Sequence, residues 1–330
     1  MTAPSRRLII SSIMLLAASL ALAVWGLCSG AVTLDIGQVF DALSGNAPRA
    51  MELVVMEWRL PRVTMALLTG AALGVSGAIF QSLMRNPLGS PDVMGFNTGA
   101  WSGVLVAMVL YGQDLTAIAL AAMAGGVLTS LLVWLLAWRN GIETFRLIIV
   151  GIGIRAMLVA FNTWLLMHAT LETALSAGLW NAGSLNGLTW GKTVPSAPFI
   201  VLMFIAAALL CRRMRLLEMG DDSACALGVS VERSRLMLML VAVVLTASAT
   251  ALAGPISFVA LVAPHIARRI SATARWGLTQ SALCGALLLL AADMCAQRLF
   301  IPYQLPVGVV TVSLGGIYLI ALLIQESRKK

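Results

Sequence analysis

The stretch LLEMGDDSACALGVSVERSR, residues 216–235, is a charged island between two long apolar runs. Basic side chains flank it at both ends: Arg212, Arg213, Arg215, Arg233 and Arg235. The stretch is long enough for two short helices and too polar to span a membrane. We therefore expect it to lie in water between two spans, where a soluble protein could act on a membrane protein through it.

The composition around this island is that of an integral membrane protein. Of the 330 residues, 60% are hydrophobic and 11% are charged, whereas soluble domains have about 45–50% apolar and about 25% charged residues. Apolar runs of spanning length recur along the chain, which favours a helical bundle in lipid over a β-barrel. The net charge of +8 does not indicate nucleic acid as a partner, because the basic residues cluster in short links between apolar runs.

The apolar runs predict an all-α membrane protein with about ten spans in one domain, residues 1–330. The spans are expected at about residues 8–28, 63–83, 92–110, 115–138, 147–167, 198–211, 236–253, 254–269, 278–295 and 307–324. The first run resembles a signal peptide, but its length and the further spans favour an uncleaved helix. Residues 168–192 are too interrupted to span, and Trp180 and Trp190 predict a helix at the outer interface.

The distribution of Lys and Arg predicts that both termini lie inside. Most of the 22 basic residues fall in links that this topology places inside: Arg6, Arg7, Arg85, Arg139, Arg146, Arg212, Arg213, Arg215, Arg233, Arg235, Arg268, Arg269, Arg275, Arg328, Lys329 and Lys330. The outside links carry fewer: Arg49, Arg59, Arg62, Lys192 and Arg298. Short cytoplasmic loops carry an excess of Lys and Arg, so this bias supports the topology.

Of the polar residues within predicted spans, where such residues are candidates for function, three are singled out. Arg155 could pair within the bundle or reach its surface, or it could face a central cavity that passes anions. Asp293 favours a structural pair or a helix-end interaction over a proton-coupling acid. His265 is expected to be a hydrogen-bonded core histidine.

Glycines in the second span predict close helix packing and say nothing about a substrate. Gly70, Gly74 and Gly77 are spaced three and four residues apart, which places them on one helix face. Small residues let helices approach closely in lipid, where packing drives their association.

No motif in the sequence indicates an enzyme. GLTWGKT, residues 187–193, has three residues between its glycines, whereas a phosphate-binding P-loop has four. The five cysteines lie far apart and there are two histidines, so neither a disulfide framework nor a metal site is expected. We expect no cofactor in this chain.

Arginines outside the membrane allow two interpretations. Arg59 and Arg62 flank a proline in EWRLPR, and Arg298 precedes the last span. They could anchor helices at the interface, or they could bind acidic groups of a soluble partner, because the planar guanidinium binds carboxylates through two hydrogen bonds.

Several segments together resemble one family, the permease subunits of iron–siderophore and vitamin B12 ABC importers. They are EWRLPR, GAALGVSGAIFQSLMRNPLGSPDVMG, GDDSACALGV, GPISFVALVAPHIARR and QLPVGVVTVSLGG. They extend from about residue 57 to 316 and so cover nearly the whole chain. Ala260 stands where the family pattern usually has glycine, which puts the closest packing at that point in doubt.

This resemblance implies the fold of a type II importer permease with cytoplasmic coupling helices in residues 216–235. It implies contact with a cytosolic ATPase dimer through Glu218, Gly220, Asp221, Asp222, Ala226, Leu227 and Gly228. It also implies that Arg59, Arg62 and Arg298 meet acidic residues of a periplasmic siderophore-binding protein. Spans five and ten would flank the translocation path, with Arg155, Asn162, Gly308, Gly315 and Gly316 as candidates for lining it.

The resemblance further implies a non-enzymatic, multi-pass subunit of the bacterial inner membrane. A second permease subunit, expected to be a paralogue, would pair with it, and ATP would be used by the ATPase. The expected cargo is a ferric siderophore, with ferric enterobactin foremost and another siderophore, haem or cobalamin as alternatives. The competing class is a proton- or sodium-coupled secondary transporter, which would require a buried acid or an ion site near the midplane.

Overall fold

The computed structural model describes residues 6–30, 32–112, 114–138, 144–272, 276–301 and 303–327, and these are almost entirely helical. In chain order the elements are α1 (Arg6–Cys28), α2 (Ile36–Leu43), α3 (Arg49–Glu52), the π-helix η1 (Leu53–Arg59), α4 (Leu60–Met84), the 3₁₀-helix η2 (Pro91–Met94), α5 (Phe96–Tyr111), α6 (Leu115–Ala137), α7 (Thr144–His168), α8 (Leu171–Asn181), α9 (Trp190–Glu218), α10 (Asp221–Ala226), α11 (Val231–Ala253), α12 (Val259–Ser271), α13 (Leu278–Arg298) and α14 (Val307–Ser327).

Six helical segments of the described chain are long and apolar enough to cross a membrane. They are Arg6–Cys28, Arg49–Met84, Thr116–Ala137, Phe145–His168, Val231–Ala253 and Leu278–Arg298. The segments Phe96–Tyr111 of α5 and Val307–Ala321 of α14 are apolar but shorter. The predicted helical membrane fold is therefore confirmed, while ten spans stays a prediction that depends also on α5, α9, α12 and α14.

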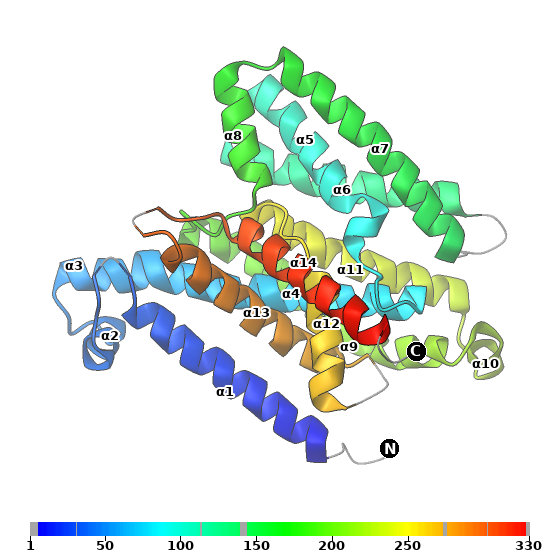
Figure 1. Cartoon of the computed structure of the whole chain (residues 1–330), viewed down its shortest axis with the longest axis horizontal. Coiled ribbons are helices and arrows are strands. Elements are labelled where there is room, and N and C mark those ends of the chain that lie inside the picture. The colour runs from blue at the N-terminus through cyan, green and yellow to red at the C-terminus, as the bar shows by residue number, and fades with distance from the viewer. Residues whose placement is uncertain are drawn as a thin grey trace.

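Helix α4 is the centre of the bundle. It packs against α1, α9, α11, α12 and α13. In the most apolar 18-residue stretch of the segment Arg49–Met84, 78% of the residues are buried. It begins without a break after η1, where Pro61 has no N–H for the regular helical bond. Figure 1 shows α2 and α3 near one end of α4, which we call the α2 end, and α10 beyond the other, which we call the α10 end.

The predicted glycine face of α4 makes the closest helix contacts. A Cβ on Gly70 or Gly74 would overlap the backbone of Gly285 or Ser281 on α13. A Cβ on Gly77 would overlap the carbonyl of Ala260 on α12. The packing there is therefore close although Ala260 is not glycine, because Gly77 provides the space.

Helices α5 to α8 form a group beside this centre (Figure 1). Helix α5 packs on α6 and α7, and α6 packs on α11. The short helix η2 contacts α7, which brings the link after α4 next to the middle of α7. This arrangement leaves α7 on the outside of the group, with Ile152 and Met157 exposed.

The segment predicted as the eighth span, residues 254–269, is not helical throughout. Gly254 has φ 71°, and Pro255 follows it, so α11 ends and residues 254–258 are not helical. Phe258 also has a positive φ, 69°. Helix α12 has 13 residues, a length of about 20 Å, which is short of the roughly 30 Å apolar layer of a bilayer.

Two other boundaries differ from the predicted ones. The interfacial segment 168–192 holds one short helix, α8, and a turn in which Gly183 and Gly187 have positive φ. Helix α9 then begins at Trp190, well before the predicted start at residue 198. The island 216–235 contains one separate helix, α10, instead of two, because its outer parts continue α9 and α11.

Gly74→Ala is expected to destabilise the bundle, because the new Cβ would push α4 away from the Ser281 carbonyl of α13. Overpacking of this kind costs about 1–3 kcal/mol. Loss of helical circular dichroism during unfolding of the purified protein measures it. Gly153→Ala is the matched control, since no atom lies near its Cβ. Equal stability of the two variants would contradict the close α4–α13 contact.

Candidate functional site

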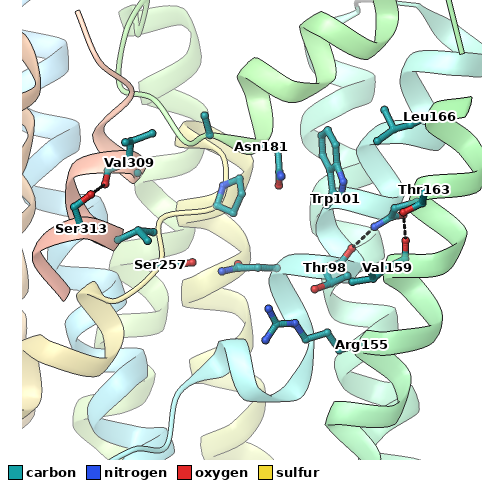
Figure 2. A pocket seen from close by; sticks show the side chains of 16 residues that line it. Thr98, Trp101, Arg155, Val159, Thr163, Leu166, Asn181, Ser257, Val309 and Ser313 are labelled. Atoms are coloured by element: carbon teal, nitrogen blue, oxygen red, sulfur yellow. Dashed lines mark hydrogen bonds between the residues drawn. The ribbon is translucent and has the colours of Figure 1, made fainter. Parts of the chain in front are cut away.

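A cavity of about 580 Å³ lies between α5, α7, α14 and the links that precede α9 and α12. Its polar lining includes Asn97, Thr98, Arg155, Asn162, Ser257 and Ser313. Figure 2 shows Arg155 extending from α7 into the space below Thr98, with Ser313 and Val309 of α14 on the opposite side. The two helices expected to flank a path, α7 and α14, therefore do flank a cavity.

Arg155 is the one charged side chain among the described residues that line this cavity. Its guanidinium forms no hydrogen bond or close ion pair within the described part of the chain. The carboxylate of Asp92 on η2 interacts electrostatically with Arg155. Of the two interpretations left open by the sequence, the geometry favours a cation that faces a cavity.

Two asparagines beside Arg155 have incompletely used amides. Asn162 donates from Nδ2 to the Thr98 carbonyl at 3.4 Å, and Asn97 donates from Nδ2 to Asp92. The Oδ1 atoms of both asparagines are buried and have no hydrogen-bond partner. The cavity is thus lined by a cation and by two asparagines whose buried Oδ1 atoms have no partner.

The three candidate glycines of α14 lie in different surroundings. Gly308 lines the cavity, and its N–H donates to the Gly183 carbonyl at 3.0 Å. Gly315 packs against the Phe258 ring, and neither it nor Gly316 is among the lining residues. The structure therefore brings Arg155, Asn162 and Gly308 together and leaves the other two glycines apart.

An aromatic stack on the cavity was not anticipated from the sequence. The rings of Trp101 and Trp180 lie parallel with centroids 6.0 Å apart, and Trp101 lines the cavity. The sequence placed Trp180 at the membrane interface because tryptophans gather there. It carried no signal that α8 would fold back onto α5.

At the α10 end, Asp221 connects three helices. It accepts from Arg85 at 2.6 Å and from Arg235 at 2.8 and 3.0 Å. Arg85, at the end of α4, also donates to the Leu217 carbonyl at 2.9 Å. We call Asp221, Arg85 and Arg235 the Asp221 brace; it ties α10 to α4 and α11.

The predicted coupling residues divide into an inner and an outer group. Glu218 accepts from Ser82 of α4 at 2.8 Å, and Asp221 lies in the brace, so both face the bundle. The outer residues Asp222, Ala226, Leu227 and Gly228 are exposed. Gly220 and Gly228 have φ of 115° and 78°, conformations that favour glycine and that set the direction of α10.

At the α2 end, the three candidate docking arginines are held in different ways. Arg59 donates to the carbonyls of Leu27 and Val32, which fixes the chain after α1. Arg298 is exposed, and its guanidinium lies 4.1 Å from the ring centroid of Trp25, a cation–π contact that leaves its N–H edge open.

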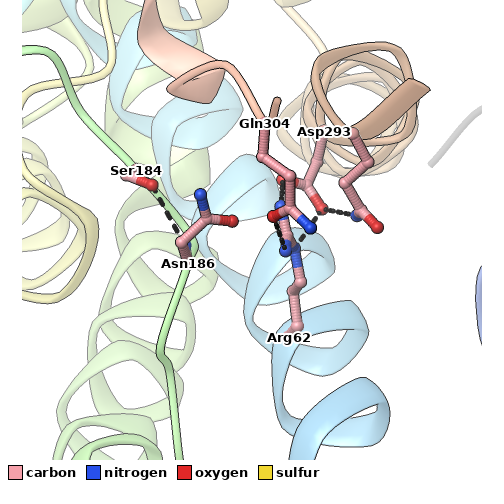
Figure 3. Close-up of polar contacts among 6 residues, drawn as sticks. Arg62, Ser184, Asn186, Asp293 and Gln304 are labelled. Atoms are coloured by element: carbon pink, nitrogen blue, oxygen red, sulfur yellow. Dashed lines mark hydrogen bonds and ion pairs between the residues drawn. The ribbon is translucent and has the colours of Figure 1, made fainter. Parts of the chain in front are cut away.

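Arg62 forms a two-bond ion pair with Asp293 of α13. The distances are 2.8 Å from Nε and 2.9 Å from Nη2, and the side chains are 16% and 2% exposed. Gln297 donates to Asp293 at 2.8 Å, and Arg62 donates to Gln304 at 3.3 Å. Figure 3 shows this cluster beside the α8–α9 link that carries Ser184 and Asn186. The predicted structural pair of Asp293 is present, with Arg62 as its partner.

The last intramembrane candidate, His265, has a core contact. Its Nδ1 lies 2.5 Å from the Tyr318 hydroxyl of α14. This agrees with the expected hydrogen-bonded core histidine. The sequence did not predict that Arg85, Arg235 and Gln304 contribute to these sites. Arg85 could have been recognised, because it directly follows the apolar segment that forms α4.

Comparisons with known proteins agree over nearly the whole chain. Residues 15–325 match the FecCD transport family. The chain is 83% identical over 326 residues to the ferric enterobactin transport system permease protein FepG of Escherichia coli, covering 99% of each chain. It is 37% identical over 310 residues to the achromobactin transport system permease protein CbrC of Dickeya dadantii, covering 93% of this chain and 89% of that one.

A solved structure shares the fold. A metal-chelate type ABC transporter in an inward-facing conformation aligns with a TM-score of 0.83 and 25% identity, over 95% of this chain and 98% of that one. The resemblance in the sequence motifs is thereby confirmed. The chain belongs to the FecCD transport family.

Proposed function

We propose that this chain is the transmembrane permease subunit of an ABC importer that carries ferric enterobactin across the bacterial inner membrane. The observation that carries the proposal is 83% identity over 99% of both chains to the E. coli ferric enterobactin permease. The cavity supports it, because its charged lining residue is a cation and a ferric catecholate is anionic. In this proposal the α10 end, with both termini, is cytoplasmic and the α2 end is periplasmic.

Transport proceeds by alternating access. A loaded binding protein docks at the α2 end, and two cytosolic ATPase subunits close on ATP at the α10 end. The outer face of α10, with Asp222, Ala226, Leu227 and Gly228, contacts the ATPase, and Gly220 sets the direction of the helix. The Asp221 brace and the Glu218–Ser82 bond pass its movement to α4.

The other partners follow from this arrangement. A second permease subunit, a paralogue, completes the path along α7 and α14, where Arg155, Asn162 and Gly308 line the cavity. Gly315 serves this path by letting α14 pack closely against Phe258, and Gly316 keeps the next position of α14 free of a side chain. ATP binds to the ATPase, and this chain holds no cofactor.

The secondary-transporter alternative is weakened by the pair of Asp293. An acid that couples transport to protons must release and bind a proton during the cycle, whereas Asp293 is buried with Arg62 and Gln297 around it. The alternative of another cargo within the same class is tested directly by comparing substrates.

The first experiment is reconstitution of the chain with its ATPase, its paralogous permease and its binding protein in liposomes. ATP-dependent uptake of ferric enterobactin is expected to exceed uptake of ferric achromobactin or haem. A Walker-motif lysine variant of the ATPase is the control. Uptake that continues with this variant, or that favours another cargo, would refute the proposal.

Asp221→Asn is expected to reduce substrate transported per ATP severalfold while the ATPase still co-purifies. Both ion pairs of the brace share Asp221, whose side chain is 44% exposed; pairs open to solvent contribute only about 0.2–1 kcal/mol each to stability, so folding should persist. Glu232→Gln, an exposed residue in the first turn of α11, makes the same charge change outside the brace and is the control. Equal coupling ratios in the two variants would show that the brace transmits nothing.

Charge reversal is expected to distinguish the roles of Arg62 and Arg298 at the α2 end. Arg298→Glu should weaken binding of the docking protein, with a salt-dependent loss, and leave stability unchanged. Arg62→Glu should mainly destabilise the fold, because an unpaired buried charge costs about 3–5 kcal/mol. Arg62→Glu with Asp293→Arg should recover stability. Thermal unfolding and binding titrations measure the two effects, and a stable Arg62→Glu single variant would contradict the structural pair.

A further inference from the structure

The cavity contains a charge that the protein leaves open. Arg155 faces it without a close ion pair in the described chain, although polar and charged groups at membrane depth are usually paired. An unpaired guanidinium retains donors in a fork that suits oxyanions. The residues on the same wall, Val159 and Leu166 of α7, are apolar, so they provide no competing negative charge.

The acceptors beside it are also open. The buried Oδ1 atoms of Asn97 and Asn162 have no partner, and leaving such an atom without a hydrogen bond is unfavourable. Both asparagines line the cavity, one from α5 and one from α7. A ligand that presents N–H or O–H donors next to an anionic group would satisfy these oxygens and Arg155 together.

Asp92 supplies a negative charge that acts on Arg155. It lies on η2, which contacts α7, and Gly95, directly after η2, lies next to the backbone of Arg155. The carboxylate acts on Arg155 at a distance and is itself held by Asn97. It therefore partly balances the charge of Arg155 without occupying the donors of the guanidinium.

We propose that this cavity is a transit binding site for an anionic metal complex with N–H or O–H donors, in which Arg155 binds the anion, Asn97 and Asn162 accept from the donors, and Asp92 limits the affinity. The inference rests on the proposed function for the identity of the complex as ferric enterobactin. The volume of about 580 Å³ falls within the range of about 300–1,000 Å³ typical of small-molecule sites. An anion bound too tightly could not leave the site. The nearby carboxylate of Asp92 prevents such tight binding because it repels the anion.

The test measures binding of radiolabelled ferric enterobactin to the assembled permease–ATPase complex in nanodiscs, without the binding protein and at several salt concentrations. Arg155→Gln should raise Kd by about 10-fold or more and flatten its salt dependence. Arg155→Lys, which keeps the charge, should recover most of the affinity. Asp92→Asn should change Kd in the opposite direction and bind the complex severalfold more tightly.

Arg215→Gln is the matched control, because it removes an exposed arginine of α9 far from the cavity and should bind as the unmodified chain does. Equal Kd for Arg155→Gln and Arg155→Lys, or weaker binding in Asp92→Asn, would overturn the inference. Failure of the unmodified complex to take up ferric enterobactin with ATP would instead refute the proposed function. Normal uptake together with an unchanged Kd in Arg155→Gln would refute this inference alone.

Discussion

The backbone contact between α4 and α13 is the constraint on which the rest of the bundle depends. In lipid there is no hydrophobic force to hold two helices together, so packing must do it. Gly70 and Gly74 of α4 meet Ser281 and Gly285 of α13 at distances that exclude even one methyl group. Because α4 also packs on four other helices, this contact fixes the position of the whole centre.

A rigid α4 connects the two ends of the molecule. Arg62, near its start, is paired with Asp293, and Arg85, directly after its end, is paired with Asp221. Gly77, between them, packs closely against Ala260 of α12. The link that precedes α12 lines the cavity with Pro255 and Ser257. Helix α4 therefore connects α10, through the Asp221 brace, with Asp293 and with the helix whose preceding link lines the cavity.

The sequence predicts the helical membrane fold, the glycine face and the charged island because each depends on local pattern: apolar length, three- and four-residue spacing, and clustered charge. It does not predict the break before α12, where Gly254 and Phe258 take positive φ and the chain packs on the α8–α9 turn through contacts distant in sequence. The cavity was predicted only in part for the same reason. Arg155 and Asn162 share a helix, whereas Asn97, Trp101 and Ser257 reach the cavity through tertiary packing.

Arg62 and Arg155 show how the partners that the fold supplies distinguish a structural arginine from a binding one. Arg62 has a carboxylate and an amide oxygen around it, and a ligand that displaced them would leave Asp293 buried and unpaired. Arg155 has a counter-charge close enough to act on it and too far to occupy its donors. Binding an anion there breaks no internal bond, so the full interaction is available to the ligand. The same side chain is thus a structural element on α4 and a binding group on α7, and the difference lies in the partners that the fold supplies.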